Sequence, residues 1–429
     1  MDINKLFDKL WPICRSITGE GLRESLNIMK KYIPLKIHSV PSNTKVFDWI
    51  VPKEWKIKDA TLIGPDGIEY CDFKKSNLSI VHYSTPIDEY KNLDELESFL
   101  HSIPEIPDAI PYVTSFYKEN WGFCMSHSLR QKMPKGKYKC KIDSELFDGE
   151  LNYGEYLLEG GKSKKEILLS TYLCHPSLAN NELSGPLVIA GLFEKLKRKK
   201  NRRFNYRFYI GPETIGSLCF LKEKGKHLLE NLNFGIVLTC LGGNSKILSA
   251  KLSRNKNHYI NKFLKSQNNF LTREFNPTAG SDERQFCSPG FNLPVINIVR
   301  DSYLGGYKGY HNSLDTKEYM NLNSIEESIN RIDKLLDDFE ELFPYERTNP
   351  YGEPQLGKRN LYANINSSQT WNTSTDNIID SREFRDGMLW ILSMSDGSND
   401  LNDISTSSGI QKSVLKEIAS KLMHHELII

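Results

Sequence analysis

The sequence predicts an α/β protein with a mostly parallel sheet, because apolar runs of strand length alternate with segments of helical character. Residues 165–174 (KEILLSTYLC) form the near-continuous apolar run that is typical of a strand buried on both faces. Residues 205–211 and 293–300 are similar, and residues 184–199 (SGPLVIAGLFEKLKRK) have the length of a helix, with a proline near its first turn. Strands that alternate with helices indicate a parallel sheet with its site beyond the carboxyl ends of the strands.

The remaining segments divide the chain into three predicted domains. The first 35 residues are predicted to be helical, and the next segment alternates short β-rich runs with Pro, Asn and Gly turns. The C-terminal tail contains a loop rich in Pro and Gly, then three short helices with a glycine between the second and third, a pattern typical of a winged helix. The predicted domains are an α/β domain (1–35 and 131–343), an inserted β-rich domain (36–130) and a linker with a winged-helix-like domain (344–429).

The composition is that of a globular protein without a strong overall electrostatic field. The 429 residues carry a formal net charge of +2, which favours neither nucleic acid nor acidic lipid. The basic run at 195–203 is interpreted as a solvated helix end, with an electrostatic docking patch as the alternative. Eight cysteines without a CxxC pair indicate buried free thiols in a reducing compartment. No signal peptide or membrane-spanning run is evident, so a cytoplasmic location is expected.

Polar residues follow several of the predicted strands. His175 follows residues 165–174, Glu213 follows residues 205–211, and His311 lies beyond the strand that ends at Arg300. The stretch TAGSDERQF adds three more groups just before that last strand: Asp282, Glu283 and Arg284. Imidazole and carboxylate together are suitable zinc ligands. Zinc polarises a carbonyl and lowers the pKa of a bound water, whose proton a nearby Glu could accept.

In order along the chain, the motifs CHPSLANNELSG, PETIGS, GSDERQF and YHNSLDT resemble those of bacterial zinc-dependent aminopeptidases. More closely, the chain is similar to a bacterial family of aminopeptidase-like proteins, as the stretches PSNTKVFDWIVPKEW, YKENWGFC and PYGEPQLGKRNLY indicate. The resemblance covers almost the whole chain. It implies a zinc-exopeptidase-like mixed sheet with an inserted β-rich domain and a C-terminal winged helix. It also implies frequent encoding among surface-polysaccharide genes.

The resemblance places His175 and His311 as metal ligands and puts Glu213 in the role of general base or ligand. Asn181 stands where the aminopeptidases have the Asp that bridges two metals, and Thr239 or Cys240 stands where another ligand Asp is expected. A neutral amide cannot supply the bridging charge. We therefore predict at most one zinc ion, with Asn181 at the site but with His175, His311 and most plausibly Glu213 as ligands; Asp282 and Glu182 are the alternatives to Glu213.

Other site residues carry alternatives. Glu213 could instead cap the following helix, and Asn180 and Asn181 could simply shape a turn. Arg284 could bind a substrate carboxylate or pair with Asp282, and Asp282 and Glu283, which replaces a family His, are further substrate-contacting candidates. Tyr117, with Trp121 and Phe123, could cover the site, although core packing is favoured. Asp315 is expected to support a ligand from behind.

The function that follows is a mononuclear zinc hydrolase acting on a peptide or amide substrate. The alternatives are a deacylase acting on a sugar or a sugar–amino-acid intermediate, and a non-catalytic regulator that senses a ligand. The presumed third helix of the tail has three Lys and no Arg, which argues against DNA binding and favours protein contacts or homo-oligomer formation through this domain. The β-rich insert is expected to act as a lid or to determine specificity.

Overall fold

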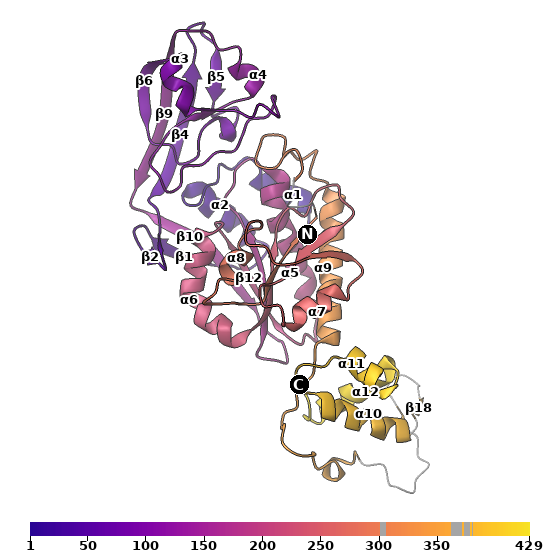
Figure 1. Ribbon diagram of the computed structural model, residues 1–429. Coiled ribbons are helices and arrows are strands. Elements are labelled where there is room, and N and C mark those ends of the chain that lie inside the picture. Colours follow the sequence, from indigo (N-terminus) through magenta and orange to yellow (C-terminus); the bar gives the residue numbers. More distant parts are fainter. Residues whose placement is uncertain (301–305, 362–370, 373–377, 380) are drawn as a thin grey trace. The chain divides into compact units, whose positions relative to one another are not determined.

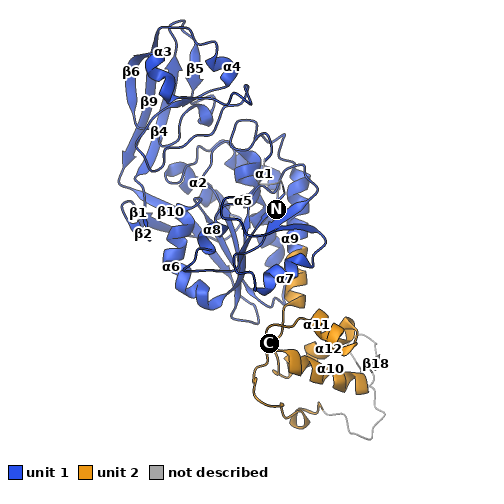
Figure 2. Ribbon diagram, in the orientation of Figure 1, with its two compact units in different colours: residues 1–333 blue, residues 334–429 orange. Residues whose placement is uncertain are grey.

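The computed structural model describes residues 1–300, 306–361, 371–372, 378–379 and 381–429 (Figure 1). It divides into two compact units, residues 1–333 and residues 334–429 (Figure 2). No helix in the described part of the chain is long and apolar enough to cross a membrane. The eight cysteines are free, and all but the half-buried Cys14 are buried.

An eight-stranded mixed sheet forms the body of the first unit. Its four central strands run parallel, and antiparallel strands flank them on both sides. Every residue of the central strand β11 is buried, as its apolar sequence predicts. In spatial order the strands are β1 (Lys36–Pro41), β10 (Glu150–Leu158), β12 (Asn205–Gly211), β11 (Glu166–Tyr172), β13 (Leu232–Leu238), β16 (Val295–Val299), β14 (Leu248–Lys251) and β15 (Phe270–Arg273).

Helices flank this sheet on both sides (Figure 1). The segment Ala179–Leu183, which leads into α5, is a single π-helical turn. The N-terminal segment, which is predicted to be helical, contains two helices. The first helix ends just before Trp11-Pro12, and the second begins directly after Gly19. The helices are α1 (Ile3–Leu10), α2 (Glu20–Met29), α5 (Ser184–Leu196), α6 (Ile215–Asn231), α7 (Tyr259–Lys265), α8 (Glu283–Phe286) and α9 (Leu322–Leu342).

The inserted segment forms a four-stranded antiparallel sheet with short additional elements. Its strands, in spatial order, are β5 (Glu69–Asp72), β4 (Glu54–Ile63), β9 (Lys137–Phe147) and β6 (Ile87–Asn92). Around them lie β2 (Lys45–Val46), β3 (Trp49–Ile50), β7 (Leu100–His101), β8 (Phe123–Cys124), α3 (Leu93–Leu96), α4 (His127–Arg130) and the 3-10 turns Asn77–Ser79 and Glu97–Phe99.

The sheet pairings shift the limits expected for the insert. β1 pairs with β10 in the large sheet, whereas β9 pairs with β4 and β6 in the small one. On these pairings the small sheet extends from Glu54 to Phe147 and the insert as a whole from residue 42 to residue 147, which differs from the expected limits of 36–130. One hydrophobic core joins the insert to the large sheet, since Trp55, Tyr83 and Phe123 of the insert belong to the same cluster as Tyr153 and Phe220.

Among its described residues, the second unit contains the end of α9, three further helices and a short strand pair. Leu415, Ile418 and Leu422 of the third helix are fully buried in its core. Gly409, with φ of 73°, ends the second helix in the left-handed conformation that a glycine adopts at low cost. The elements are the 3-10 turn Gly357–Arg359, β17 (Trp371–Asn372), β18 (Ile378–Ile379), α10 (Ser381–Met394), α11 (Leu401–Ser408) and α12 (Lys412–His424).

Candidate metal centre

Loops at the carboxyl ends of the central parallel strands bring the motif residues together. His175 lies three residues beyond β11 and Glu213 two residues beyond β12, its direct neighbour in the sheet. Cys240 lies two residues beyond β13, the other neighbour of β11. Because parallel strands end at one edge, residues that are far apart in sequence meet there.

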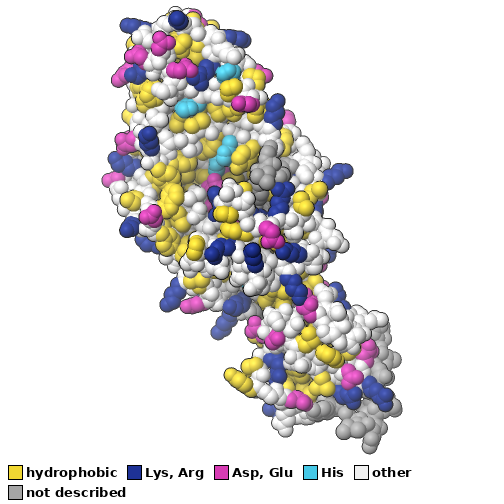
Figure 3. All heavy atoms as spheres, in the orientation of Figure 1, with side chains coloured by type: hydrophobic (Ala, Val, Ile, Leu, Met, Phe, Trp, Pro, Cys, Tyr) yellow, Lys and Arg dark blue, Asp and Glu magenta, His cyan; other side chains and the backbone are white. Residues whose placement is uncertain are grey.

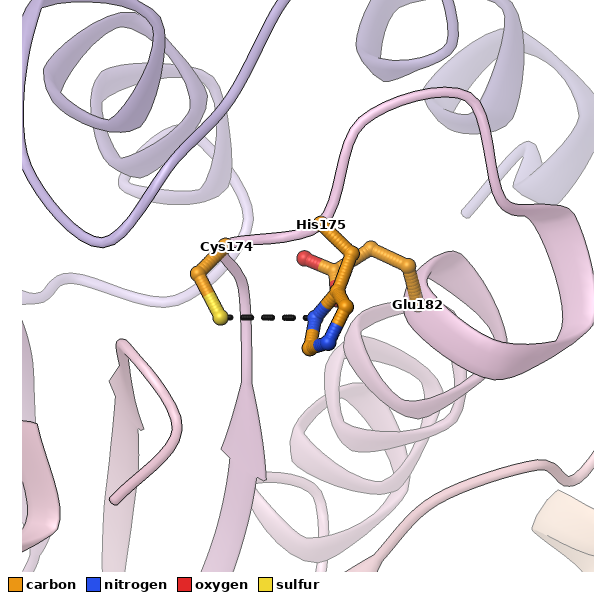
Figure 4. A group of neighbouring side chains, drawn as sticks. All are labelled: Cys174, His175 and Glu182. Atoms are coloured by element: carbon orange, nitrogen blue, oxygen red, sulfur yellow. Dashed lines mark hydrogen bonds and ion pairs between the residues drawn. The ribbon is translucent and has the colours of Figure 1, made fainter. Parts of the chain in front are cut away.

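The imidazole of His175 is held on one side and open on the other. Its Nδ1 lies 2.9 Å from Oε2 of Glu182, and Figure 4 shows these side chains converging with Cys174. Its Nε2 lies 3.8 Å from Oε2 of Glu213, and the His311 ring is 5.5 Å from the His175 ring between centroids. Burial opposes protonation of His175, but Cys174 and Glu182 outweigh it and raise its pKa well above the usual value. Burial and the charge of His175 lower the pKa of His311 to about 3.

A buried arginine that the sequence analysis did not identify supports this arrangement. Arg15 lies between α1 and α2, is fully buried, and places Nε 3.8 Å from Oε1 of Glu182. The same Nε donates a hydrogen bond of 3.2 Å to the carbonyl of His175. Burial lowers the pKa of Arg15, while the carboxylate of Glu182 counters that effect. The ion pair therefore fixes Glu182, which in turn fixes the His175 ring.

Cys174, His175 and Glu182 place ligand-type atoms within 4.8 Å of one another. Two observations argue against a metal ion on this side of the ring. Burial raises the pKa of Cys174 to about 11, and its sulfur accepts a 3.3 Å hydrogen bond from the backbone N–H of Glu213. The Cys174 sulfur is already engaged by that backbone N–H, and Glu182 is already balanced by Arg15. These groups orient His175, which leaves Nε2 as its free coordinating atom.

Glu213 and Asp282 occupy the same edge but differ in exposure. The Glu213 side chain is 28% exposed, and its Oε1 accepts a 2.5 Å hydrogen bond from Ser281 Oγ. Asp282 is fully buried, and its Oδ1 accepts hydrogen bonds from the Thr214 N–H (2.7 Å) and Ser217 Oγ (3.1 Å). Burial, together with the charge of Glu213, raises the pKa of Asp282 to about 8. Asp282 thus secures the loop that carries Glu213.

Asp315 supports the turn that contains Asn181. Its two carboxylate oxygens accept hydrogen bonds of 2.8 Å from the backbone N–H groups of Asn180 and Asn181, and Tyr307 donates another of 2.7 Å. Burial raises the pKa of Asp315 to about 6 against these hydrogen bonds. The buried Oδ1 of Asn181 has no hydrogen-bond partner among the described residues. Asn181 therefore brings a neutral, unpaired oxygen to the position of the expected Asp.

The three remaining predicted contacts fall in different environments. Glu283 is buried, pairs with Lys251 and accepts the backbone N–H of Ser281, so its carboxylate is already committed. Arg284 donates to the carbonyl of Ser281, and among the described residues no hydrogen bond or ion pair joins it to Asp282, which was one of its two expected partners. Core packing was the favoured interpretation of Tyr117, but its side chain is 53% exposed. Trp121, in contrast, stacks on the ring of Phe99.

The insert contributes an aromatic residue that no motif indicated. Tyr112 donates its backbone N–H to the carbonyl of His311 at 2.9 Å. Its ring lies 5.0 Å from the ring of His175 and 5.8 Å from that of His311, between centroids. Its buried hydroxyl has no hydrogen-bond partner among the described residues. One side of the centre is therefore built by the insert.

Backbone strain gathers in the loops that build the centre. Four non-glycine residues there have left-handed φ values: Ser177 (49°), Thr214 (63°), Cys240 (50°) and His311 (56°). Such conformations cost of order 1 kcal/mol or more each, and they persist where the surrounding structure imposes them. The site loops are thus held away from relaxed geometry.

Comparison with known proteins identifies the family. A model described as a domain of unknown function, DUF4910, matches residues 4–341, and a winged helix-turn-helix model matches residues 343–429. The chain belongs to the DUF4910 family. A curated relative from Clostridium acetobutylicum, described as a candidate polysaccharide biosynthesis protein with an aminopeptidase-like domain, is 42% identical; the match covers 100% of this chain and 96% of the relative.

Solved structures confirm the expected fold for this DUF4910 member. The crystal structure of a candidate peptidase from Clostridium acetobutylicum has a TM-score of 0.79 and 40% identity, covering 100% of this chain and 96% of that one. BSAP, a zinc aminopeptidase from Bacillus subtilis, has a TM-score of 0.57 and 11% identity, covering 78% and 93%. The M28 peptidase precursor from Shewanella amazonensis has a TM-score of 0.53 and 9% identity, covering 78% and 91%. The predicted zinc-aminopeptidase fold and winged-helix domain are both confirmed.

Proposed function

We propose that the protein is a hydrolase that uses one zinc ion to cleave an amide bond. The observation that carries the proposal is the arrangement of His175. Its Nδ1 is held by Glu182, while its Nε2 lies 3.8 Å from Glu213 and its ring lies beside His311. A metal-binding histidine typically has one ring nitrogen fixed by a carboxylate so that the other can bind the ion.

The donor types of His175, His311 and Glu213 suit a single zinc ion, although among the described residues only Cys174, His175 and Glu182 bring three ligand atoms within 4.8 Å of one another. Two imidazoles and one carboxylate, from His175, His311 and Glu213, make a three-ligand set of the kind that leaves a position open for water. The neutral oxygen of Asn181 cannot offset the repulsion between two cations, which supports one ion rather than two. When bound there, zinc would polarise a carbonyl and acidify a water.

The side chains of this chain supply the remaining chemistry. Glu213 completes the ligand set and is the one candidate carboxylate at the edge with clear solvent exposure, so it is also placed to accept a proton from water. Glu182 and Arg15 hold the His175 ring in place. Asp282 anchors the loop of Glu213 through Thr214. The strained backbone in these loops supports a functional role, since strain of this kind gathers at active sites.

The curated relative favours a particular substrate class. Its description combines polysaccharide biosynthesis with an aminopeptidase-like domain. We therefore propose an amide attached to a sugar, such as an amino-acylated or N-acylated amino sugar, over a free peptide. The alternative substrate is the amino-terminal peptide bond that the aminopeptidase fold of BSAP suggests.

Metal content tests the proposal first. Protein purified without added zinc is measured by elemental analysis as wild type, His175→Ala and Glu213→Gln, with the exposed His424→Ala as the matched control. We expect about one zinc per chain in the wild type and the control, and loss of most of it in the other two. Amide hydrolysis should fall by a factor of about 10² or more in those two variants.

Each other result has a clear meaning. Two zinc ions per chain would show that another carboxylate bridges them despite Asn181. If the wild type holds no metal and His175→Ala binds the amide-bearing sugar as well as the wild type does, the proposed hydrolase activity is contradicted. That result would favour a ligand-sensing protein built on a peptidase fold.

A further inference from the structure

A cavity of about 670 Å³ lies between the β2–β3 hairpin and residues 115–119 of the insert. Its volume is within the range of small-molecule sites, roughly 300–1,000 Å³. Figure 3 shows hydrophobic side chains gathered where the insert meets the α/β body, close to a histidine side chain. Of the candidate site residues only Tyr117 lines this cavity, and most of the other lining residues belong to the stretches PSNTKVFDWIVPKEW and YKENWGFC.

Exposed aromatic rings form one wall of the cavity. Trp49 is 37% exposed and Tyr117 53% exposed, and their rings meet edge to face with centroids 5.0 Å apart. Phe116 and Tyr83 extend this wall, with ring centroids 5.2 Å apart. Large aromatic side chains left open to solvent at a cavity offer flat apolar faces to a ligand.

Charged side chains of both signs lie at the same cavity. They are Asp48, Lys53, Lys118 and Glu119. Within the described part of the chain, none of these four side chains lies within hydrogen-bond or ion-pair distance of another protein group. Two acids and two bases give no net charge, so the cavity does not select an anion or a cation. It offers instead a mixed set of hydrogen-bond donors and acceptors.

One chain segment and a row of packed rings lie between the cavity and the candidate metal centre. Tyr112 contacts His175 and His311, and Tyr117 lies five residues further along the same segment, at most about 18 Å away between Cα atoms. Ring contacts also connect the two regions, from Tyr112 through His82, Trp55 and Tyr83 to Phe116.

We infer that this cavity binds the sugar ring of the substrate while the metal centre acts on the attached amide. A pyranose ring has an apolar C–H face that packs on aromatic rings and a rim of hydroxyl groups that both donate and accept hydrogen bonds. The wall formed by Trp49 and Tyr117 matches that face, and the charged groups of both signs match that rim. An apolar peptide side chain would leave the charged groups without partners. The inference rests on the proposed hydrolase for the amide, but its binding test does not.

Binding is tested separately from catalysis with saturation-transfer difference NMR. The probes are the methyl glycosides of N-acetylglucosamine and N-acetylgalactosamine, with N-acetyl-leucinamide as the peptide-like comparison. The protein is tested as wild type, His175→Ala, Trp49→Ala and Tyr117→Ala. The matched control is Tyr90→Ala, because Tyr90 is an exposed aromatic residue on β6 that does not line the cavity.

We expect at least one glycoside to bind, with saturation strongest on its ring C–H protons. Binding should weaken by at least about tenfold in Trp49→Ala and Tyr117→Ala, should weaken less in His175→Ala, and should stay within about twofold of wild type in Tyr90→Ala. Binding of the leucinamide alone, or equal glycoside binding by all variants, would overturn the inference.

Catalysis and binding can fail independently. A wild-type protein that binds a glycoside through Trp49 but holds no metal would contradict the hydrolase and leave the sugar site standing. A zinc-loaded, active hydrolase that binds neither glycoside would overturn the sugar site alone.

Discussion

The two sides of the candidate site are built in different ways. On the sheet side, His175 and Glu213 each follow a buried parallel strand, and the ladder between β11 and β12 sets their separation. On the insert side, Tyr112 and Tyr117 lie in irregular backbone outside the named strands. The sheet side carries carboxylates, imidazoles and the buried Arg15, whereas the insert side presents mostly aromatic rings.

This difference suggests that the two sides of the candidate site have different roles. Hydrogen-bonded strands place charged groups reproducibly, which a metal centre requires. Irregular segments can change in sequence and length without disturbing that centre, which suits substrate recognition. Changes on the sheet side should therefore affect stability and metal binding, and changes on the insert side should affect recognition and acid sensitivity.

Arg15→Met should give the largest stability effect. The substitution leaves the carboxylate of Glu182 buried without its counter-charge, and loss of one partner of a buried ion pair typically costs about 3–5 kcal/mol. Urea unfolding at neutral pH should show that loss. Activity should also fall, because Glu182 would no longer fix the His175 ring.

Two further variants separate charge imbalance from lost packing. The double variant Arg15→Met with Glu182→Gln removes both charges and should recover much of the lost stability. Arg198→Met removes an exposed arginine and should change the free energy of unfolding by no more than about 0.5 kcal/mol. A single Arg15→Met variant as stable as the wild type would show that the sheet side does not depend on this pair.

Strands with strong patterns were predictable, and their grouping into sheets was less so. The apolar run of β11 indicates burial on both faces directly. The short strands β14 and β15, of four residues each, carry too little pattern to be found. The strand pairings place the limits of the insert differently from the expected ones, because β9 and β10 are consecutive strands that belong to different sheets. The residues of a strand do not themselves indicate which other strand it pairs with.

The site shows the same limit. His175 and Glu213 could be predicted because each follows a strand within a motif. Arg15 lies about 160 residues before His175 in the chain, and nothing in its surroundings distinguishes it from a surface arginine. Tyr112 meets His311 only because the backbone of the insert pairs with the segment around residue 312. Such contacts depend on tertiary structure, so a single sequence cannot reveal them.

His82 should make the insert side sensitive to acid. Burial lowers the pKa of His82 to about 4 from an ordinary value near 6.5. Between these values the unfolded chain binds the proton more readily than the folded one, so stability should fall as the pH drops from about 6.5 towards 4. The loss from this group should be no more than about 3.5 kcal/mol, since one pKa unit corresponds to about 1.4 kcal/mol.

Denaturant unfolding at several pH values measures this effect. His82→Gln keeps a donor for the carbonyl of Asn77 and cannot titrate, so its stability should depend less on pH than that of the wild type. The exposed His424→Gln should follow the wild type. Parallel pH profiles for wild type and His82→Gln would remove His82 as the source of any acid sensitivity.

Tyr112→Phe should give the smallest change and tests the insert side most directly. The substitution removes a buried hydroxyl without a partner, so stability should stay constant or rise by up to about 1 kcal/mol, and zinc content should not change. If the hydroxyl binds substrate beside the two imidazoles, kcat/KM should fall by about tenfold, while Tyr90→Phe should have no effect. A more stable Tyr112→Phe variant with full activity would limit the insert's part in the site to the cavity at Trp49 and Tyr117. A loss of zinc would instead show that the insert helps to build the metal centre itself, and the division between the two sides would not hold.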